Sequence, residues 1–198
     1  MFHVEYRLIP EYQFPAAVDD AVAIYRALLR LNIFPSQMFI MGDSAGGGLA
    51  LLTVQAIIAR QLPVPRGAIT LSAQTDLSLS GESYTRNRLT DVMLSINPTK
   101  WMVNILMGTN HSELSLDSPF FSPLFYTFEG FPPMYINVGT AEITEDDSKR
   151  LLKKVQDVGV DVTFEEGLHF MHIYPIFFLY YPKARNTLNN INKWIQTI

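Results

Sequence analysis

The sequence predicts an α/β fold in which a mostly parallel sheet carries helices on both of its faces. Three observations support this prediction. Short apolar runs alternate along the chain with longer stretches whose apolar residues recur at helical spacing. A glycine-dense turn joins one of these runs directly to an apolar helix. With 48% hydrophobic residues among 198, the chain can bury the core of one domain that covers residues 1–198.

The first part of the chain supplies two predicted strands and two predicted helices. Val4–Leu8 is a short strand candidate that ends just before an Ile-Pro pair. Ala16–Leu31 follows, with apolar residues at helical spacing. Gln37–Met41 is a compact apolar run, which is typical of a buried parallel strand. Leu49–Arg60 is apolar on nearly every side, so we expect this helix to be buried.

The second part continues the alternation around a less regular stretch. Gly67–Ser72 is a further buried-strand candidate, and residues 77–130 include an irregular or cap-like segment with one predicted helix near Pro98–Met107. Two more apolar or alternating runs predict strands, and two stretches with helical periodicity predict helices. These last elements are the strands Met134–Val138 and Val160–Phe164 and the helices Thr144–Val158 and Lys183–Ile198.

The charge and the cysteine content exclude several classes of function. Lys and Arg number 15 against 19 Asp and Glu, and the formal net charge of −4 argues against nucleic-acid binding. The absence of cysteine excludes a disulfide framework and a thiolate metal site. No run of about 18 apolar residues predicts a membrane span. The N-terminus does not have the basic residues followed by an apolar run that a signal peptide requires. We therefore expect no signal peptide and a cytoplasmic location. The sequence implies no metal and no cofactor, and it leaves a homodimer open.

The sharpest local signal is the run Gly42-Asp43-Ser44-Ala45-Gly46, which contains Gly-x-Ser-x-Gly. It follows a predicted buried strand and precedes a predicted apolar helix, which is the context of a nucleophile elbow. A serine on such a turn has a strained backbone, and we expect Gly42 and Gly46 to let the strand and the helix pack around it. The backbone N–H of Ala45 is then placed to donate to an oxyanion. A glycine-rich turn that binds phosphate without chemistry is the alternative.

A serine nucleophile needs a base and an acid that orients the base. In this topology the three residues come in the order Ser, then Asp or Glu, then His. Glu142 and Asp146 follow the next-to-last predicted strand, and His169 and His172 follow the last one. Because the carboxyl ends of parallel strands meet at one edge of a sheet, both placements suit a triad. The order alone does not decide between the two acids or between the two histidines.

Several short motifs occur in the order typical of one known family. They are Tyr6-Arg7-Leu8-Ile9-Pro10-Glu11, the glycine-rich serine motif, Thr75-Asp76-Leu77-Ser78, Ser122-Pro123-Leu124, and Gly139-Thr140-Ala141-Glu142 with Asp146-Asp147-Ser148 downstream. In these motifs the chain resembles the hormone-sensitive-lipase-like branch of the α/β-hydrolases, which includes bacterial acetyl esterases and arylacetamide deacetylases. The resemblance runs nearly from end to end.

This resemblance implies an α/β-hydrolase fold and a serine esterase that acts on a small-molecule ester with a short-to-medium acyl chain. Ser44 corresponds to the nucleophile that forms the acyl-serine intermediate. Glu142 is the first choice for the acid, since the downstream Asp-Asp-Ser fixes the alignment, and Asp146 is the alternative. His172 is the first choice for the base because the Ile-Tyr-Pro that follows it fits the family pattern, and His169 is the alternative.

The chain departs from the family pattern at its start. Members carry a His-Gly-Gly-Gly loop, whose N–H groups bind the oxyanion, some tens of residues before the Tyr-Arg-Leu segment, whereas five residues precede Tyr6 here. We therefore expect a sheet that lacks its first strands and part of the cap, with a gap beside the strand Gln37–Met41. Two alternatives to an active esterase follow: a catalytically weak or inactive fragment, and a non-catalytic ligand-binding protein on the same scaffold.

Overall fold

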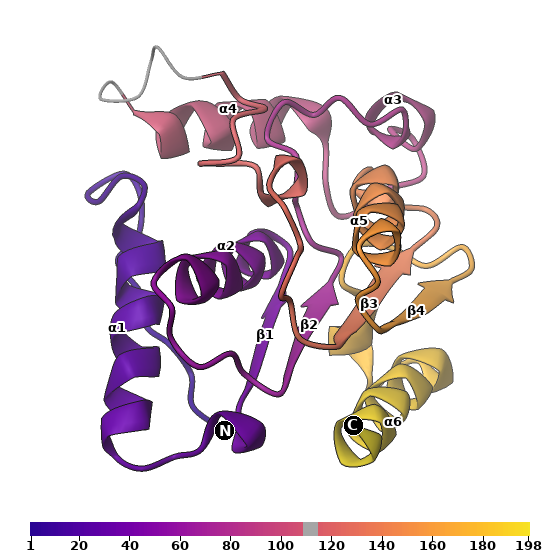
Figure 1. Cartoon of the computed structure of the whole chain (residues 1–198). Coiled ribbons are helices and arrows are strands. Elements are labelled where there is room, and N and C mark those ends of the chain that lie inside the picture. The colour runs from indigo at the N-terminus through magenta and orange to yellow at the C-terminus, as the bar shows by residue number, and fades with distance from the viewer. Residues whose placement is uncertain (109–114) are drawn as a thin grey trace.

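Four parallel strands form the sheet of this computed structural model, which describes residues 1–108 and 115–198 (Figure 1). The strands are β1 (Phe39–Asp43), β2 (Gly67–Leu71), β3 (Met134–Gly139) and β4 (Val162–Gly167). They lie in the order β1-β2-β3-β4, and each neighbouring pair is parallel. All four coincide with predicted strands to within a few residues. Because they run in one direction, their carboxyl ends lie at one edge of the sheet.

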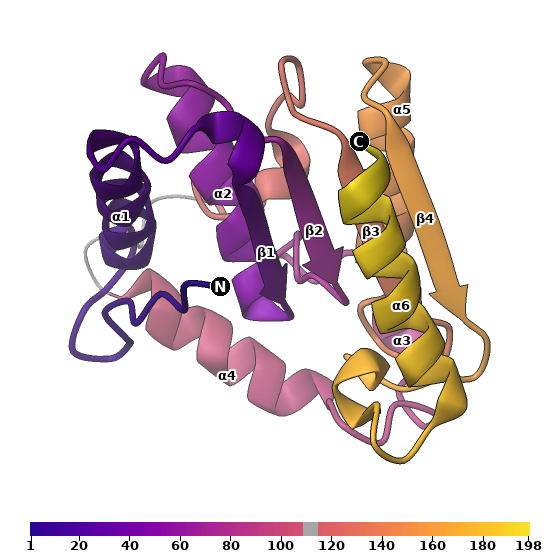
Figure 2. The same ribbon diagram turned by 90° about the horizontal axis from the view of Figure 1, so that it is seen from below.

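Helices cover both faces of this sheet, as the sequence predicts (Figure 2). Helices α2 (Ala45–Ala59) and α5 (Glu145–Asp157) pack on one face, and α6 (Pro182–Thr197) packs on the other. Helix α1 (Ala16–Arg30) lies outside α2, and α4 (Ile96–Met107) crosses the carboxyl-end edge of the sheet. The short elements are helix α3 (Ser83–Arg86) and the 3-10 turns η1 (Pro35–Gln37), η2 (Pro123–Phe125) and η3 (Tyr174–Phe177). None of the helices in the described ranges is long and apolar enough to cross a bilayer.

Apolar side chains fill the space on each side of the sheet. On one side, Leu51 of α2 and Leu151 of α5 belong to one core cluster with Ile136 of β3. On the other side, Trp194 of α6 packs in one cluster with Ile69 of β2. Every residue of β2 and β3 is buried, because helices cover both faces of these central strands. This two-sided burial explains why they are nearly continuous apolar runs in the sequence.

The predicted strand Val4–Leu8 is wrong, since these residues form no strand. The backbone N–H of Arg7 donates to the carboxylate of Asp20 on α1 at 2.9 Å, and the Arg7 guanidinium binds the same carboxylate. Among the residues described, no strand pairs with the outer edge of β1. The segment therefore has no neighbouring ladder to join, and its backbone donor bonds a side chain instead.

Helix α2 begins at Ala45, four residues before the predicted start at Leu49. Glycine has a low helix propensity, which is why the sequence places Gly46–Gly48 in a turn. Tertiary packing overrides that propensity here. A Cβ on Gly47 would lie 2.6 Å from the Cβ of Ala73, so the first turn of the helix approaches the loop after β2 as closely as only glycine allows.

Candidate active site

Ser44 occupies a sharp turn between β1 and α2. Its φ and ψ are 51° and −124°, and non-glycine residues rarely adopt a positive φ. The Ser44 N–H donates to the carbonyl of Leu71 at 2.9 Å, and the Ser44 carbonyl accepts from the N–H of Gln74 at 3.0 Å. Strand β2 and the loop after it thus hold the strained residue on both sides, which fixes its hydroxyl at the carboxyl end of the sheet.

The two glycines that flank the serine play different parts. A Cβ on Gly42 would lie 2.0 Å from the carbonyl oxygen of Gly46, so position 42 admits only glycine. A Cβ on Gly46 would meet nothing within 4 Å, so the prediction that its small size is needed for packing is wrong. Gly46 instead contributes the backbone that lies against Gly42.

His172 connects Ser44 to Glu142. The Nε2 atom of His172 lies 2.8 Å from Oγ of Ser44, and Nδ1 lies 2.6 Å from Oε2 of Glu142. An ionised carboxylate only accepts hydrogen bonds, so Nδ1 carries the ring proton and Nε2 is free to accept from the serine hydroxyl. The exposed fractions of His172 and Glu142 are 2% and 0%, so bulk water does not compete for these contacts.

Three further donors hold the Glu142 carboxylate. The Ser72 hydroxyl donates to Oε1 at 2.9 Å, the Thr144 hydroxyl donates to Oε2 at 2.7 Å, and the N–H of Gly139 also donates to Oε1. The Ser72 hydroxyl in turn accepts from the N–H of Ile173 at 2.9 Å, one residue after the histidine. Ser72 therefore ties the acid to the loop that carries the imidazole.

The sequence and this arrangement match one known family. A family model described as alpha/beta hydrolase fold matches residues 1–176. The chain is 33% identical over 195 residues to an acetyl-hydrolase of Streptomyces hygroscopicus, covering 98% of this chain and 64% of that protein. A crystal structure of an esterase from the bacterial hormone-sensitive lipase family matches with a TM-score of 0.92 and 31% identity, over 96% of this chain and 63% of the esterase. The chain belongs to the hormone-sensitive-lipase-like α/β-hydrolases.

The chain also resembles the esterase EstE5, in a crystal structure soaked with p-nitrophenyl butyrate. The TM-score is 0.89 and the identity 34%, over 96% of this chain and 63% of EstE5. The chain thus spans slightly less than two thirds of the length of the relatives it matches. The stretch that the family model matches includes Ser44, Glu142 and His172.

The two alternative site residues, Asp146 and His169, do not contact Ser44. The Asp146 carboxylate accepts from the N–H of Ser83 and from the Arg86 guanidinium, each at 2.8 Å. Burial by itself would raise the pKa of Asp146, but these bonds hold it below its usual value. His169 is exposed, and its N–H donates to the Thr140 hydroxyl at 2.8 Å. In the described part of the chain, neither residue has a side-chain hydrogen bond to the serine or to His172.

The irregular segment between β2 and β3 supports the loop that carries Glu142. The side-chain amide of Asn87 donates to the backbone carbonyl of Glu142 at 2.8 Å. The buried carboxylate of Asp91 accepts from the N–H of Ile143 at 2.8 Å. Both contacts fix the backbone around the acid. The irregular segment therefore helps to position Glu142.

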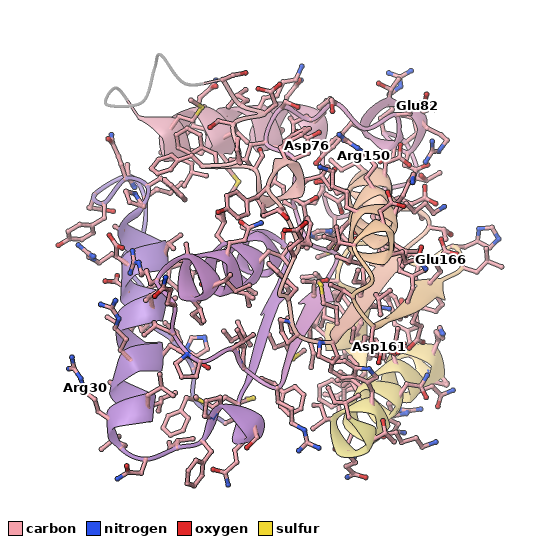
Figure 3. The ribbon with its side chains drawn as sticks, viewed as in Figure 1. Arg30, Asp76, Glu82, Arg150, Asp161 and Glu166 are labelled. Carbon is pink, nitrogen blue, oxygen red and sulfur yellow. The ribbon has the colours of Figure 1, made fainter. Side chains whose placement is uncertain are left out.

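A buried acidic cluster fastens the loop after β2 to α5. Asp76 is fully buried and pairs with Arg150 at 2.7 Å (Figure 3). Asp147 is also fully buried and accepts from the N–H groups of Thr75 and Asp76 at 2.7 and 3.0 Å. Burial raises the pKa of Asp147 to about 7, since two N–H bonds compensate for only part of its lost hydration. These residues hold the scaffold and do not contact the serine.

The N–H of Ala45 is available as a hydrogen-bond donor beside the nucleophile. Ala45 is the first residue of α2, and an N–H at that position has no acceptor within its own helix. In the described part of the chain, no backbone carbonyl accepts a hydrogen bond from it. The start of a helix also carries a partial positive charge, which favours negative charge on a bound group.

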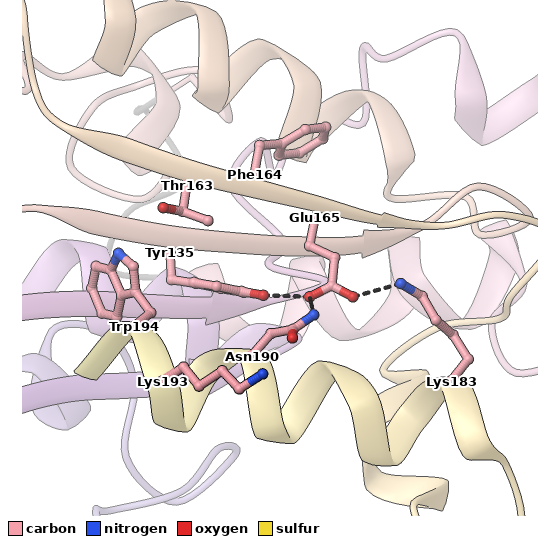
Figure 4. Close-up of a pocket in the computed structure, with 8 residues that line it drawn as sticks. All are labelled: Tyr135, Thr163, Phe164, Glu165, Lys183, Asn190, Lys193 and Trp194. Carbon is pink, nitrogen blue, oxygen red and sulfur yellow. Dashed lines mark hydrogen bonds and ion pairs between the residues drawn. The ribbon is translucent and has the colours of Figure 1, made fainter. Parts of the chain in front are cut away.

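A hollow at α6 lies away from these residues. Its volume is about 410 Å³, and it lies between the β3–β4 side of the sheet and α6 (Figure 4). Glu165 is at its centre and accepts from Lys183 at 2.6 Å and from the Tyr135 hydroxyl. Burial would raise the pKa of Glu165, but these donors hold it below its usual value. With its acid already paired, this hollow anchors α6 and is not the candidate active site.

Sequence reasoning did not find Ser72 and Thr144. A hydroxyl residue after a strand or near an acid is common, and only the folded backbone shows that both hydroxyls point at one carboxylate. The single usable signal was position: Ser72 directly follows β2, at the same edge as Ser44.

Proposed function

We propose that this chain hydrolyses carboxylic esters through an acyl-serine intermediate, with Ser44, His172 and Glu142 as the triad. The observation that carries the proposal is the unbroken hydrogen-bond chain from the Ser44 hydroxyl through the buried imidazole to the buried carboxylate. This is the geometry that serine acylation requires, because the nucleophile, the base and the orienting acid must be in contact in this order.

Each proton transfer in the proposed reaction has a defined donor and acceptor. As Oγ of Ser44 attacks the ester carbonyl carbon, its proton passes to Nε2 of His172, and Glu142 stabilises the imidazolium. The N–H of Ala45 donates to the oxyanion. The tetrahedral intermediate then breaks its bond to the alcohol oxygen, which takes the proton from Nε2. Water attacks the acyl group with the same imidazole as base, and the serine leaves with that proton while the acid departs.

We propose short-to-medium acyl chains as substrates, and a small-molecule ester as the class. The support is indirect: one relative is named an acetyl-hydrolase, and EstE5 was soaked with a butyrate ester. The p-nitrophenyl esters of acetate, butyrate and octanoate therefore span the proposed range.

The test is hydrolysis of these three esters by the wild-type chain, by Ser44→Ala and by the control Ser36→Ala, which removes an exposed hydroxyl before β1, at the opposite end of that strand from Ser44. We expect Ser44→Ala to lower kcat at least about a thousandfold, since triad removal leaves only residual catalysis. Ser36→Ala should match the wild type. Equal rates for wild type and Ser44→Ala would remove the serine from the mechanism. A wild type that binds the butyrate ester without hydrolysing it would favour the ligand-binding alternative.

A further inference from the structure

The segment between β4 and α6 exposes an unusual number of large apolar side chains. Leu179 and Tyr180 are 70% and 76% exposed. We call the exposed group the apolar rim, and its members are Leu168, Ile176, Phe178, Leu179, Tyr180 and Tyr181. Residues 178–181 are consecutive and all exposed, so they are not scattered single residues, and a contiguous apolar surface indicates a binding partner.

Backbone hydrogen bonds and ring contacts hold the apolar rim in a defined conformation. The N–H groups of Tyr180 and Tyr181 both donate to the carbonyl of Phe177, at 2.9 and 3.1 Å. The ring of Tyr181 contacts the rings of Phe170 and Phe177, with centroids 5.8 and 6.5 Å apart. These contacts hold the chain in a turn whose outward side chains are presented together.

A second segment extends the apolar rim. Val92 and Tyr181 line the same small hollow, of about 220 Å³, so the chain before α4 lies beside the rim. Leu89, Val92 and Met93 are all exposed in that segment. The combined surface therefore comes from two loops at the carboxyl-end edge of the sheet (Figure 2).

The free charges at the apolar rim are positive. Arg185 is exposed and donates to the carbonyls of Phe178 and Leu179 at 3.2 and 3.3 Å, which places its guanidinium against the rim. Arg88 is exposed in the neighbouring segment. Among the residues described, neither arginine pairs with an acid, although the chain as a whole carries a formal charge of −4.

Three acids in or next to the segments of the rim already have hydrogen-bond or ion-pair partners. Asp91 is buried and accepts from backbone N–H groups, and Glu165 pairs with Lys183. Glu166, which precedes the rim, pairs with Lys149 at 3.3 Å. The rim therefore presents apolar side chains together with two exposed guanidinium groups that form no ion pair in the described part of the chain.

We propose that the apolar rim docks on a lipid surface that carries anionic headgroups. Leucine, isoleucine and phenylalanine side chains gain by entering the acyl region, and tyrosine favours the boundary where its ring is buried and its hydroxyl is wet. The two arginines complement the negative headgroups. The rim lies in the loop that carries His172, so docking brings the candidate active site to the lipid surface.

Co-sedimentation with vesicles of phosphatidylcholine alone, or with 30% phosphatidylserine, tests the proposal. Leu179→Ser has a matched control in Leu31→Ser, because Leu31 is also 70% exposed but lies at the far end of α1. We expect Leu179→Ser to lower partition into the anionic vesicles by about tenfold, as burial of a leucine side chain predicts. Leu31→Ser should partition like the wild type. Tyr180→Ser is a second rim variant, and circular dichroism confirms that each variant folds.

The charge contribution is measured with Arg88→Gln and Arg185→Gln, against Arg30→Gln on the last turn of α1 as the control (Figure 3). We expect each rim arginine to account for about a fivefold change on anionic vesicles and for little on neutral ones. Three results would overturn the proposal: no binding of the wild type to anionic vesicles, equal losses for Leu179→Ser and Leu31→Ser, or sedimentation velocity that shows a dimer dissociated by Leu179→Ser. The last result would assign the rim to a second copy of the chain.

Discussion

Replacing Ser72 by alanine should separate the positioning of the acid from the chemistry of the nucleophile. Ser72 is fully buried, and its hydroxyl makes two bonds at 2.9 Å, one to the Glu142 carboxylate and one from the N–H of Ile173. A hydrogen bond to a charged group contributes about 1.5–3 kcal/mol, and an orphaned buried N–H costs about 1–3 kcal/mol. We therefore expect Ser72→Ala to lower the free energy of unfolding by about 3 kcal/mol.

The same change should slow catalysis, because Glu142 loses one of its donors and the histidine loop loses its tie to the acid. We expect kcat for p-nitrophenyl butyrate to fall by about 10- to 100-fold, the range typical of a displacement of up to 1 Å in a catalytic group. KM should change little, since Ser72 is buried behind the acid. Urea unfolding and steady-state kinetics on the same preparation measure both effects.

Ser72→Gly is the matched variant, because Ser72 has a φ of 51°. Glycine adopts this φ without strain, so Ser72→Gly should be more stable than Ser72→Ala by about 1 kcal/mol. Its kcat should nevertheless be as low as that of Ser72→Ala, since both lack the hydroxyl. The reasoning is refuted if Ser72→Ala keeps its kcat within twofold of wild type, or if glycine restores the rate along with the stability.

Three further predictions follow from the contacts of single residues. Glu142→Gln should lower kcat by about 10⁴-fold, since an amide no longer enforces the required imidazole tautomer, whereas Asp146→Asn should lower it less than about threefold; comparable losses would move the acid to Asp146. Gly42→Ala should destabilise the fold by about 3 kcal/mol in urea unfolding, because its Cβ would meet the Gly46 carbonyl, while Gly46→Ala should change stability by less than about 1 kcal/mol; equal effects would contradict the packing argument. Burial raises the pKa of Asp147 to about 7, so the folded state binds this proton more tightly than the unfolded chain does, and wild type should lose stability relative to Asp147→Asn as pH rises from about 4 to about 7, with no further change above that range; unfolding free energies that keep a constant difference between pH 5 and pH 8 would show that Asp147 does not titrate there.

Sequence patterns predict the elements that local composition determines. β2 and β3 are buried on both faces, and their apolar runs identify them almost to the residue. The segment Val4–Leu8 shows the limit of this reasoning, because a strand exists only beside a partner. The backbone N–H of Arg7 bonds to Asp20 instead of to a neighbouring strand. The local sequence pattern does not show whether a partner strand is present.

In the candidate site, too, local motifs are predictable from the sequence and tertiary contacts are not. Motif and order identify Ser44 as the nucleophile candidate, since a glycine-flanked serine between a strand and a helix is a local feature. The order alone left the base open between His169 and His172, and the resemblance to the family favoured the second. Of these two histidines, the backbone places His172 beside the serine, while His169 faces solvent. Ser72 reaches the site through its tertiary contacts to Glu142 and Ile173, which no spacing along the chain reveals.

The most direct test of the triad is covalent labelling by a fluorophosphonate probe, with the modified peptide located by mass spectrometry. A serine is phosphonylated rapidly only where a neighbouring imidazole takes its proton, so the label reports the Ser44–His172 contact itself. We predict one adduct, on Ser44, in the wild-type chain, and labelling at least about a hundredfold slower in His172→Ala. A wild type without an adduct on Ser44, or with the same labelling rate as His172→Ala, would contradict the proposed mechanism.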